Sequence, residues 1–330
     1  MQRLSQTISD LFPTGKGLLA ADESTGSVGK RLTPIKVEST PENRRRFREL
    51  FLSAPGAEQY MSGVILVDET LRQSSSDGVP FAKVLADRGI VPGIKVDGGS
   101  KPLPGFPDEE VTEGLDGLAA RLQEYASLGA RFAKWRAVIR IGKGIPTSVC
   151  IETNALQLAL YAGRCQEAGI VPMVEPEVLL DGAHTIADAE RVTTDVLKTL
   201  IATLETHRVD LAGTIVKTSM VVPGKESGTL ATPEQIAEAT TRCLRSAIPK
   251  GVGGVVFLSG GQTSEQATLN LNAIAKLGPF EWPLTFCYAR ALQYPATDLW
   301  AGKDENLATA RAAFIERLKA NAAASTGNFS

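Results

Sequence analysis

Short apolar runs in this chain end on reactive or phosphate-compatible residues at nearly even spacing. The five run ends are Lys134, Glu175, Lys217, Ser259 and Arg290, which are separated by 41, 42, 42 and 31 residues. A strand with its returning helix takes about 30–40 residues, so each interval can hold one βα unit. The series therefore predicts successive parallel strands with one functional residue at each carboxyl end.

Three further apolar runs, at 17–23, 63–69 and 91–97, raise the number of expected strands to eight. Several of the eight runs are continuously apolar, as is typical of parallel strands buried on both faces. Eight such units predict an α/β fold, a (β/α)₈ barrel whose strand ends share one catalytic face. We expect a single barrel domain over 1–320 with extra terminal helices, followed by a short polar tail over 321–330.

Helix and loop signals lie between the runs. Pro41 and Pro233 each stand at a position typical of a first helical turn, and Thr232 is a cap residue before the second of them. A helix after Arg290, with apolar residues on one stripe, is expected to dock on the barrel. The proline- and glycine-rich segment 97–110 is expected to be an irregular loop, and the last seven residues are expected to fray.

Composition disfavours several classes of partner. The chain has 35 basic and 37 acidic residues, which does not predict a nucleic-acid-binding surface, and no apolar run has the length of a membrane span. Four scattered cysteines are typical of a reduced, cytoplasmic protein. With two histidines and no Cys/His cluster, we expect neither a metal site nor a cofactor, although carboxylate-held magnesium stays open.

Lys217 ends the apolar run TIVK. An isolated lysine of this kind is usually a surface side chain whose stem lies along apolar neighbours. Here it is in register with the other run ends, and Lys134 should lie on the same face. We expect burial beside a second cation to lower the pKa of Lys217 and leave a neutral amine that can attack a carbonyl.

Three carboxylates are candidate proton-transfer groups. Glu175 and Glu177 stand two residues apart, so a strand directs both side chains to one face. They are either a salt-bridged pair at the rim or a proton shuttle for imine formation. Asp22, at the end of the first run, is a further candidate base, although an Asp before Ser-Thr-Gly is often a turn or cap residue.

Two places are suited to phosphate. Ser259, Gly260 and Gly261 form a glycine turn before a helix, and Arg290 follows the eighth run, where this fold commonly binds phosphate. A second polar turn contains Ser24 and Ser27, and Lys95 ends the third run. Two anion sites around an amine predict a Schiff-base lyase that acts on a sugar phosphorylated at both ends.

Seven ordered motifs carry a family resemblance. They are LLAADESTGS, GIKVD, ARFAKWR, VPMVEPEVLLDG, GTIVKTSMV, FLSGGQTSEQATLNLNAI and LTFCYARALQ. Over residues 5–320 the chain resembles class I fructose-1,6-bisphosphate aldolase. The resemblance implies a metal-independent barrel enzyme of glycolysis and gluconeogenesis. Such an enzyme cleaves fructose 1,6-bisphosphate reversibly to dihydroxyacetone phosphate and glyceraldehyde 3-phosphate.

The resemblance also implies a role for each matching residue. Lys217 forms the Schiff base, Glu175 acts as acid and base with help from Lys134 and Glu177, and Asp22 takes the C4 hydroxyl proton. The 1-phosphate lies against Ser259, Gly260 and Arg290, and the 6-phosphate lies toward Ser24, Ser27, Lys95 and Arg136. The family is usually homotetrameric, which implies a homo-oligomer here.

The chain departs from the family pattern at several positions: Gly98, Ala183, Ala212, Thr218 and Ala289 replace the usual residues. It also ends at Ser330 without the tyrosine that assists carbanion protonation in many members, so we expect another group or water to serve. Two alternatives stay open. One is an aldolase that prefers fructose 1-phosphate or sedoheptulose 1,7-bisphosphate, and the other is a non-catalytic scaffold that binds sugar phosphates.

Overall fold

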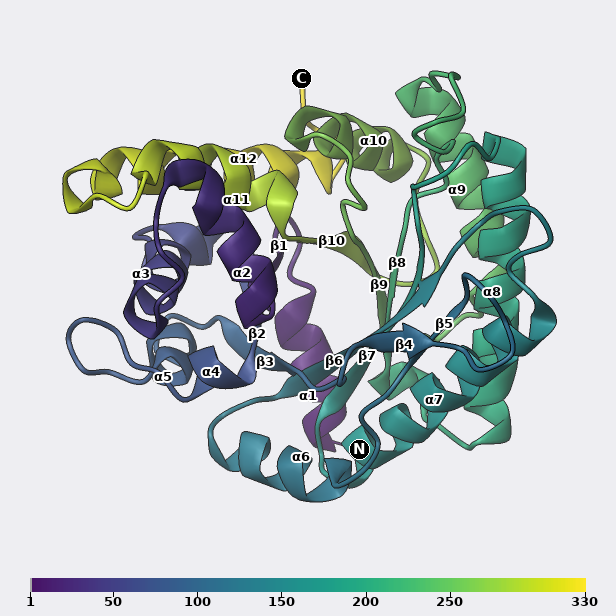
Figure 1. Cartoon of the computed structure of the whole chain (residues 1–330), viewed down its shortest axis with the longest axis horizontal. Helices are drawn as coiled ribbons and strands as arrows, with labels where there is room; N and C mark the ends of the chain where they lie inside the picture. The colour runs from purple at the N-terminus through teal and green to yellow at the C-terminus, as the bar shows by residue number, and fades with distance from the viewer. Residues whose placement is uncertain (1) are drawn as a thin grey trace.

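The computed structural model describes residues 2–330, and its centre is a closed barrel of eight parallel strands (Figure 1). The order around the barrel is β1-β10-β9-β8-β7-β6-β3-β2. The strands are β1 (Gly17–Ala20), β2 (Met61–Leu66), β3 (Val91–Lys95), β6 (Phe132–Ile139), β7 (Val171–Val178), β8 (Ile215–Thr218), β9 (Gly254–Phe257) and β10 (Leu284–Tyr288). Each strand overlaps one of the eight predicted runs, so the predicted (β/α)₈ barrel is confirmed.

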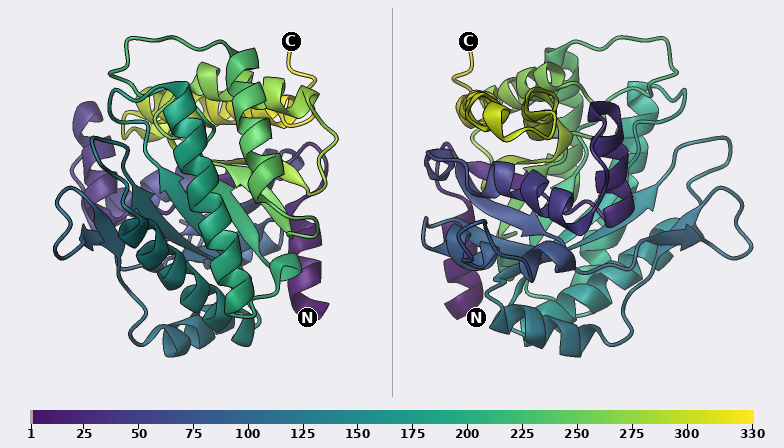
Figure 2. Two further views of the ribbon diagram at one scale, coloured as in Figure 1. Left: turned by 90° about the vertical axis from the view of Figure 1, so that its right-hand side faces the viewer. Right: turned by 60° about the vertical axis from the view of Figure 1, so that its left-hand side comes forward.

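Helices surround the strands, as the two side views in Figure 2 show. They are α1 (Gln2–Leu11), α2 (Thr25–Leu32), α3 (Pro41–Leu52), α4 (Asp68–Leu71), α5 (Phe81–Ala86), α6 (Leu118–Ser127), α7 (Ser148–Glu167), α8 (Ile186–Thr206), α9 (Pro233–Ala247), α10 (Ser264–Lys276), α11 (Arg290–Trp300) and α12 (Leu307–Ala324). The two starts predicted from proline are confirmed at α3 and α9. None of the helices in residues 2–330 combines the length and the apolar character needed to span a bilayer.

The barrel interior is closed at the amino ends of its strands. Phe12, which follows α1, meets Gly254 at the start of β9, where an added Cβ would lie 2.2 Å from the ring. Leu4 and Leu11 of α1 belong to the same apolar cluster as the inward side chains of the barrel. Because α1 fills this end, the opening lies at the carboxyl ends, where the predicted functional residues stand.

Two expectations about the outer segments are wrong. Segment 97–110 is not wholly irregular, because Ser100–Pro102 (β4) pairs with Glu110–Thr112 (β5) as a small antiparallel sheet. The C-terminal residues are also held in place. The Phe329 N–H donates to Asn272 Oδ1 at 3.1 Å, and Asn272 Nδ2 donates to the Phe329 carbonyl at 3.0 Å. An amide side chain on α10 thus replaces the water that would solvate a frayed end.

Glycine facing an aromatic ring inside the barrel generates a stability prediction. A Cβ on Gly93 of β3 would lie 2.3 Å from the Phe132 ring, so Gly93→Ala overpacks the interior and should destabilise the fold by about 1–3 kcal/mol. Gly163, inside α7, has open space around its Cβ position, and Gly163→Ala should be neutral or stabilising by about 0.5–1 kcal/mol. Chemical denaturation of both variants checks the pair; equal effects would contradict the packing argument.

Candidate active site

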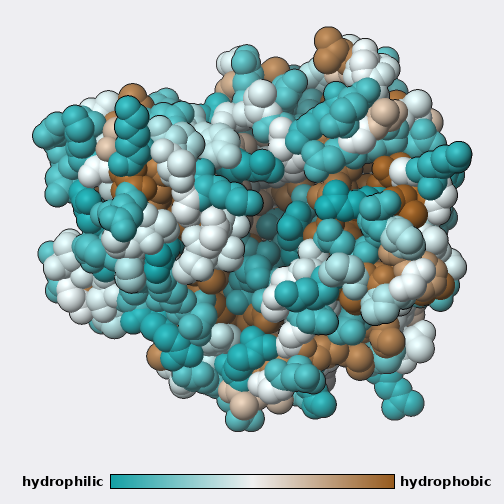
Figure 3. Space-filling model, in the orientation of Figure 1, coloured by the Kyte–Doolittle hydropathy of each residue, from teal (hydrophilic) through white to brown (hydrophobic). Residues whose placement is uncertain are grey.

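A cavity of about 730 Å³ opens at the carboxyl ends of the strands. The face shown in Figure 3 is hollowed near its centre, and hydrophilic residues show inside the hollow. Twelve of the thirteen predicted site residues line the cavity: Asp22, Ser24, Ser27, Lys95, Lys134, Arg136, Glu175, Glu177, Lys217, Ser259, Gly260 and Arg290. The thirteenth, Gly261, adjoins the cavity beside Arg290, since a Cβ built on it would lie 3.7 Å from Arg290 Nη2.

Four buried charged groups form a continuous chain in the cavity. Lys217 Nζ lies 2.9 Å from Glu175 Oε1, and Glu175 Oε2 lies 3.1 Å from Lys134 Nζ. Lys134 Nζ in turn lies 2.6 Å from Asp22 Oδ2. The signs alternate along the chain, so each charge has an opposite partner at contact distance. This arrangement allows four charges to be buried together, because a buried charge without a partner is strongly unfavourable.

Strand register brings these groups together. Lys134 of β6 lies opposite Met173 of β7, and the next residues along β7 place Glu175 beside Arg136. Glu175 and Glu177 both line the cavity, as their two-residue spacing predicts. Glu175 contacts the two lysines, whereas Glu177 pairs with the Arg136 guanidinium. The two glutamates therefore share a face but belong to different ion pairs.

The carboxylates hold their protons weakly. Burial alone raises the pKa of a carboxyl group, but the ammonium groups of Lys134 and Lys217 outweigh it at both Asp22 and Glu175. The pKa of Asp22 lies well below its usual range, and the pKa of Glu175 is also lowered. Both groups are ionised at neutral pH in the unliganded protein.

The expected lowering of the Lys217 pKa is wrong for the unliganded protein. Burial lowers it, and so does repulsion from Lys134, but the Cys287 sulfur, Glu175 and Asp22 together outweigh them, so the pKa of Lys217 is raised. The pKa of Lys134 is also raised, because Asp22 and Glu175 outweigh its burial. The sequence argument counted the second cation and did not include the carboxylate at 2.9 Å. Lys217 is therefore an ammonium at rest and must give up a proton before it can attack a carbonyl.

One end of the cavity is a glycine turn between β9 and α10. Gly260 and Gly261 have φ of +56° and +90°, a left-handed conformation that favours glycine. Thr263 caps α10 and Arg290 begins α11, so two helix amino ends meet here. No carboxylate among residues 2–330 forms a salt bridge with Arg290. Backbone N–H groups, helix amino ends and a free guanidinium together favour an anion.

The other end has polar groups that are already partnered. Ser24 caps α2 and accepts from the Ser27 N–H at 3.3 Å. Lys95 Nζ lies 2.6 Å from Asp97 Oδ1, and Arg136 pairs with Glu177. A phosphate at this end has to share these cations with carboxylates.

Sequence reasoning missed a charged cluster at the cavity wall. The buried carboxylate of Glu23 pairs with Arg48 and with Arg31, and Arg31 also donates to Gln293 Oε1. Arg31 and Glu23 line the cavity. One signal was available: Arg48 occupies an apolar position of α3 between Phe47 and Leu50 and is 1% exposed. An arginine at a core position requires a buried carboxylate.

The thiols and possible metal ligands offer little further chemistry. Cys287 lies at the cavity, and burial raises the pKa of its thiol to about 12, so it is uncharged at neutral pH. All four cysteines are buried and unpaired. Within residues 2–330, no three His, Cys, Asp or Glu side chains are grouped to hold a metal ion.

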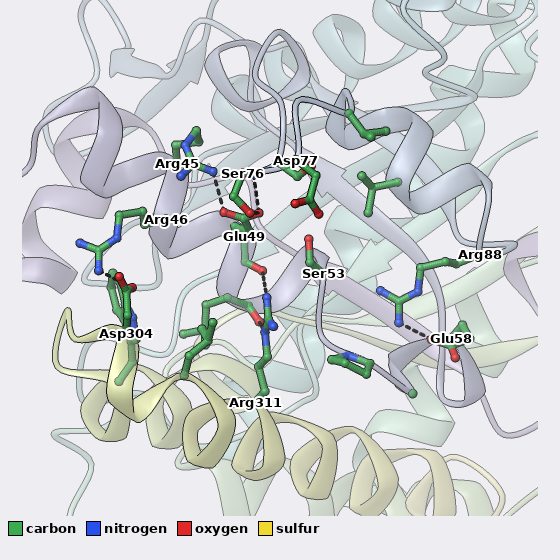
Figure 4. A pocket seen from close by; sticks show the side chains of 18 of the residues that line it. Arg45, Arg46, Glu49, Ser53, Glu58, Ser76, Asp77, Arg88, Asp304 and Arg311 are labelled. Atoms are coloured by element: carbon green, nitrogen blue, oxygen red, sulfur yellow. Dashed lines mark hydrogen bonds and ion pairs between the residues drawn. The ribbon is translucent and has the colours of Figure 1, made fainter.

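A second cavity, of about 830 Å³, lies between α3, α12 and the loop at 75–79 (Figure 4). None of the predicted site residues lines it. Its charged side chains mostly neutralise one another in the pairs Arg45–Glu49, Arg46–Asp304 and Arg88–Glu58 (Figure 4). Volume alone therefore does not identify the site; the shared ion pairs of the smaller cavity do.

Comparisons with known proteins agree with this geometry. The family model for fructose-bisphosphate aldolase class-I matches residues 3–330. A probable fructose-bisphosphate aldolase class 1 from Xanthomonas campestris is 52% identical, over 100% of this chain and 99% of that protein. Cytosolic fructose-bisphosphate aldolase 5 of Arabidopsis thaliana is 50% identical, over 99% of this chain and 91% of that protein. The structure of a Plasmodium falciparum fructose-bisphosphate aldolase in complex with TRAP and a small-molecule inhibitor is similar, with a TM-score of 0.98 and 45% identity. The match covers 100% of this chain and 95% of that chain.

The ion-pair chain makes a prediction about Lys217. In Glu175→Gln the ammonium loses its nearest carboxylate while Lys134 still repels it, so the pKa of Lys217 should fall. Labelling of Lys217 by an amine-reactive reagent, followed by peptide mass across pH, should then have a lower midpoint than in the wild type. Glu177→Gln is the matched control, because Glu177 pairs with Arg136, and it should leave the midpoint in place. An unchanged or higher midpoint in Glu175→Gln would refute the assignment.

Proposed function

Since the chain belongs to the class I fructose-bisphosphate aldolase family, we propose that Lys217, Glu175, Lys134 and Asp22 carry out its lyase reaction. The enzyme cleaves fructose 1,6-bisphosphate reversibly to dihydroxyacetone phosphate and glyceraldehyde 3-phosphate through a lysine Schiff base. The observation that carries the assignment is the buried contact of 2.9 Å between Lys217 Nζ and Glu175 Oε1. It joins the amine that the imine requires to a base that can take its proton.

Imine formation begins with proton transfer along this contact. The Lys217 ammonium gives a proton to Glu175, and the neutral amine attacks the C2 carbonyl of the open-chain sugar. After proton transfer within the carbinolamine, Glu175 returns a proton to the departing hydroxyl, which leaves as water. A protonated imine remains on Lys217, and Glu175 is again a carboxylate that stabilises this cation.

Bond cleavage uses the other end of the ion-pair chain. Asp22 takes the proton of the C4 hydroxyl, and the electrons of the C3–C4 bond move into the imine to give an enamine. Glyceraldehyde 3-phosphate leaves as the aldehyde. Water then supplies a proton to C3 of the enamine while Asp22 releases the C4 hydroxyl proton to solvent, and hydrolysis of the imine releases dihydroxyacetone phosphate and frees Lys217. Lys134, 2.6 Å from Asp22 and 3.1 Å from Glu175, orients both carboxylates.

The phosphate ends are assigned by charge. The 1-phosphate lies at Ser259, Gly260, Gly261 and Arg290, where the guanidinium has no competing carboxylate and the glycine turn exposes N–H groups. The 6-phosphate lies toward Ser24 and Ser27, with Lys95 and Arg136. Cationic groups at both ends favour a bisphosphate over fructose 1-phosphate.

The proposal extends to assembly and location. A homotetramer is proposed from the family resemblance, and work in the cytoplasm is supported by the cytosolic names of plant relatives. The scaffold alternative is disfavoured. Burying four charged groups costs desolvation free energy, and a pocket that only binds sugar phosphates does not require them.

Trapping of the imine tests the assignment. Borohydride reduction in the presence of dihydroxyacetone phosphate should leave one adduct, on Lys217, located by peptide mass. Lys217→Met should form no adduct and lose at least a thousandfold in kcat, because it removes the amine whose contact with Glu175 Oε1 begins the proposed proton transfer. Lys143→Met, at an exposed lysine outside the cavity, is the matched control and should trap as the wild type does.

Two outcomes would count against the assignment. An adduct on Lys134 would move the nucleophile from β8 to β6, two strands away. Sugar-phosphate binding with no adduct on any lysine would support the scaffold alternative instead.

A further inference from the structure

A lysine outside the predicted set lies beside the proposed 1-phosphate turn. Lys225 belongs to the loop between β8 and α9. A Cβ atom built on Gly261 would lie 3.0 Å from Lys225 Nζ and 3.7 Å from Arg290 Nη2. Two cationic groups, one from this loop and one from the first residue of α11, therefore border the same side of the Gly261 Cα. The turn consists of Ser259, Gly260 and Gly261, so it has no carboxylate that could attract either cation.

The position of Lys225 is held by its own backbone. Three N–H groups of its loop donate to carbonyls of the loop after β7, over 2.9–3.0 Å: Gly224 to His184, Lys225 to Leu180, and Glu226 to Gly182. The loops approach so closely that a Cβ on Gly224 would lie 2.1 Å from the Gly182 carbonyl oxygen. This ladder fixes the point from which the lysine side chain reaches the turn.

The ammonium of Lys225 has one carboxylate partner, Asp181 Oδ1, at 3.0 Å. Both side chains are about half exposed, at 45% and 56%. An exposed ion pair of this kind contributes little, about 0–1 kcal/mol, so exchanging the carboxylate for another anion costs little. A phosphate dianion is a stronger partner than a carboxylate for an ammonium that faces it.

We propose that Lys225 is a specificity-determining residue that, together with Arg290, attracts the phosphate of the substrate to the Gly260–Gly261 turn. This inference rests on the proposed function, because it requires the 1-phosphate to bind at that turn. The ligands concerned are the ketose 1-phosphates and dihydroxyacetone phosphate, which present a phosphate to this end of the cavity. Lys225 contacts none of the four groups of the ion-pair chain, so it acts on binding and not on bond cleavage.

Lys225→Gln tests the inference on the full-length enzyme. At low ionic strength, we expect KM for fructose 1,6-bisphosphate to rise about three- to tenfold. The dihydroxyacetone phosphate concentration that half-saturates borohydride trapping at Lys217 should rise by the same factor. The kcat should stay within about twofold, and the difference from the wild type should shrink as salt screens the charge. Lys225→Arg, which keeps the cation, should restore most of the affinity.

Asp181→Asn separates phosphate binding from a merely structural role. It breaks the same ion pair as Lys225→Gln but leaves the ammonium in place. If Lys225 only fastened two loops, both variants would raise KM alike; if it attracts phosphate, Asp181→Asn leaves KM unchanged or lowers it. An equal rise in both variants, or no rise in Lys225→Gln, overturns the inference.

The wild-type measurement keeps the two proposals apart. If the wild type traps dihydroxyacetone phosphate on Lys217 and Lys225→Gln half-saturates at the same concentration, only the role of Lys225 fails. If the wild type forms no adduct, the proposed function fails and the role of Lys225 falls with it.

Discussion

The site depends on one carboxylate that is shared between two buried ammonium groups. Glu175 contacts Lys217 through one oxygen and Lys134 through the other, and Lys134 passes the contact on to Asp22. Removing any one member leaves a buried charge uncompensated, which is strongly unfavourable. The same network keeps Lys217 protonated at rest. In the proposed mechanism, imine formation begins when Lys217 transfers that proton to Glu175.

The rest of the fold closes the barrel at one end and leaves it open at the other. Helix α1 fills the amino end of the barrel, and aromatic rings occupy the space that the interior glycines leave. The carboxyl end cannot be filled in the same way, because its inward positions carry Lys134, Glu175 and Lys217. The opening of the cavity is thus a consequence of which residues end the strands.

Much of this arrangement could be predicted from the residues alone. Because side chains alternate along a strand and parallel strands end on one face, the even spacing of Lys134, Glu175 and Lys217 was enough to place them together. The Glu23–Arg48 pair was not predicted, because the position of Arg48 among the apolar residues of α3 does not show that Glu23, from a separate segment, is its partner. Lys225 was missed for a similar reason, because loop-to-loop hydrogen bonds set its position and no sequence period encodes them.

The sequence by itself determined the fold class, the strand ends and the kinds of group that meet in the cavity, because all three follow from periodicity and spacing. Only the tertiary structure decided the protonation state of Lys217. A pKa depends on which charges lie within a few ångströms, and spacing placed a cation near Lys217 without showing that a carboxylate lies nearer. The position of Lys225 beside the glycine turn and the docked C-terminal residues were decided in the same way, by contacts between distant segments.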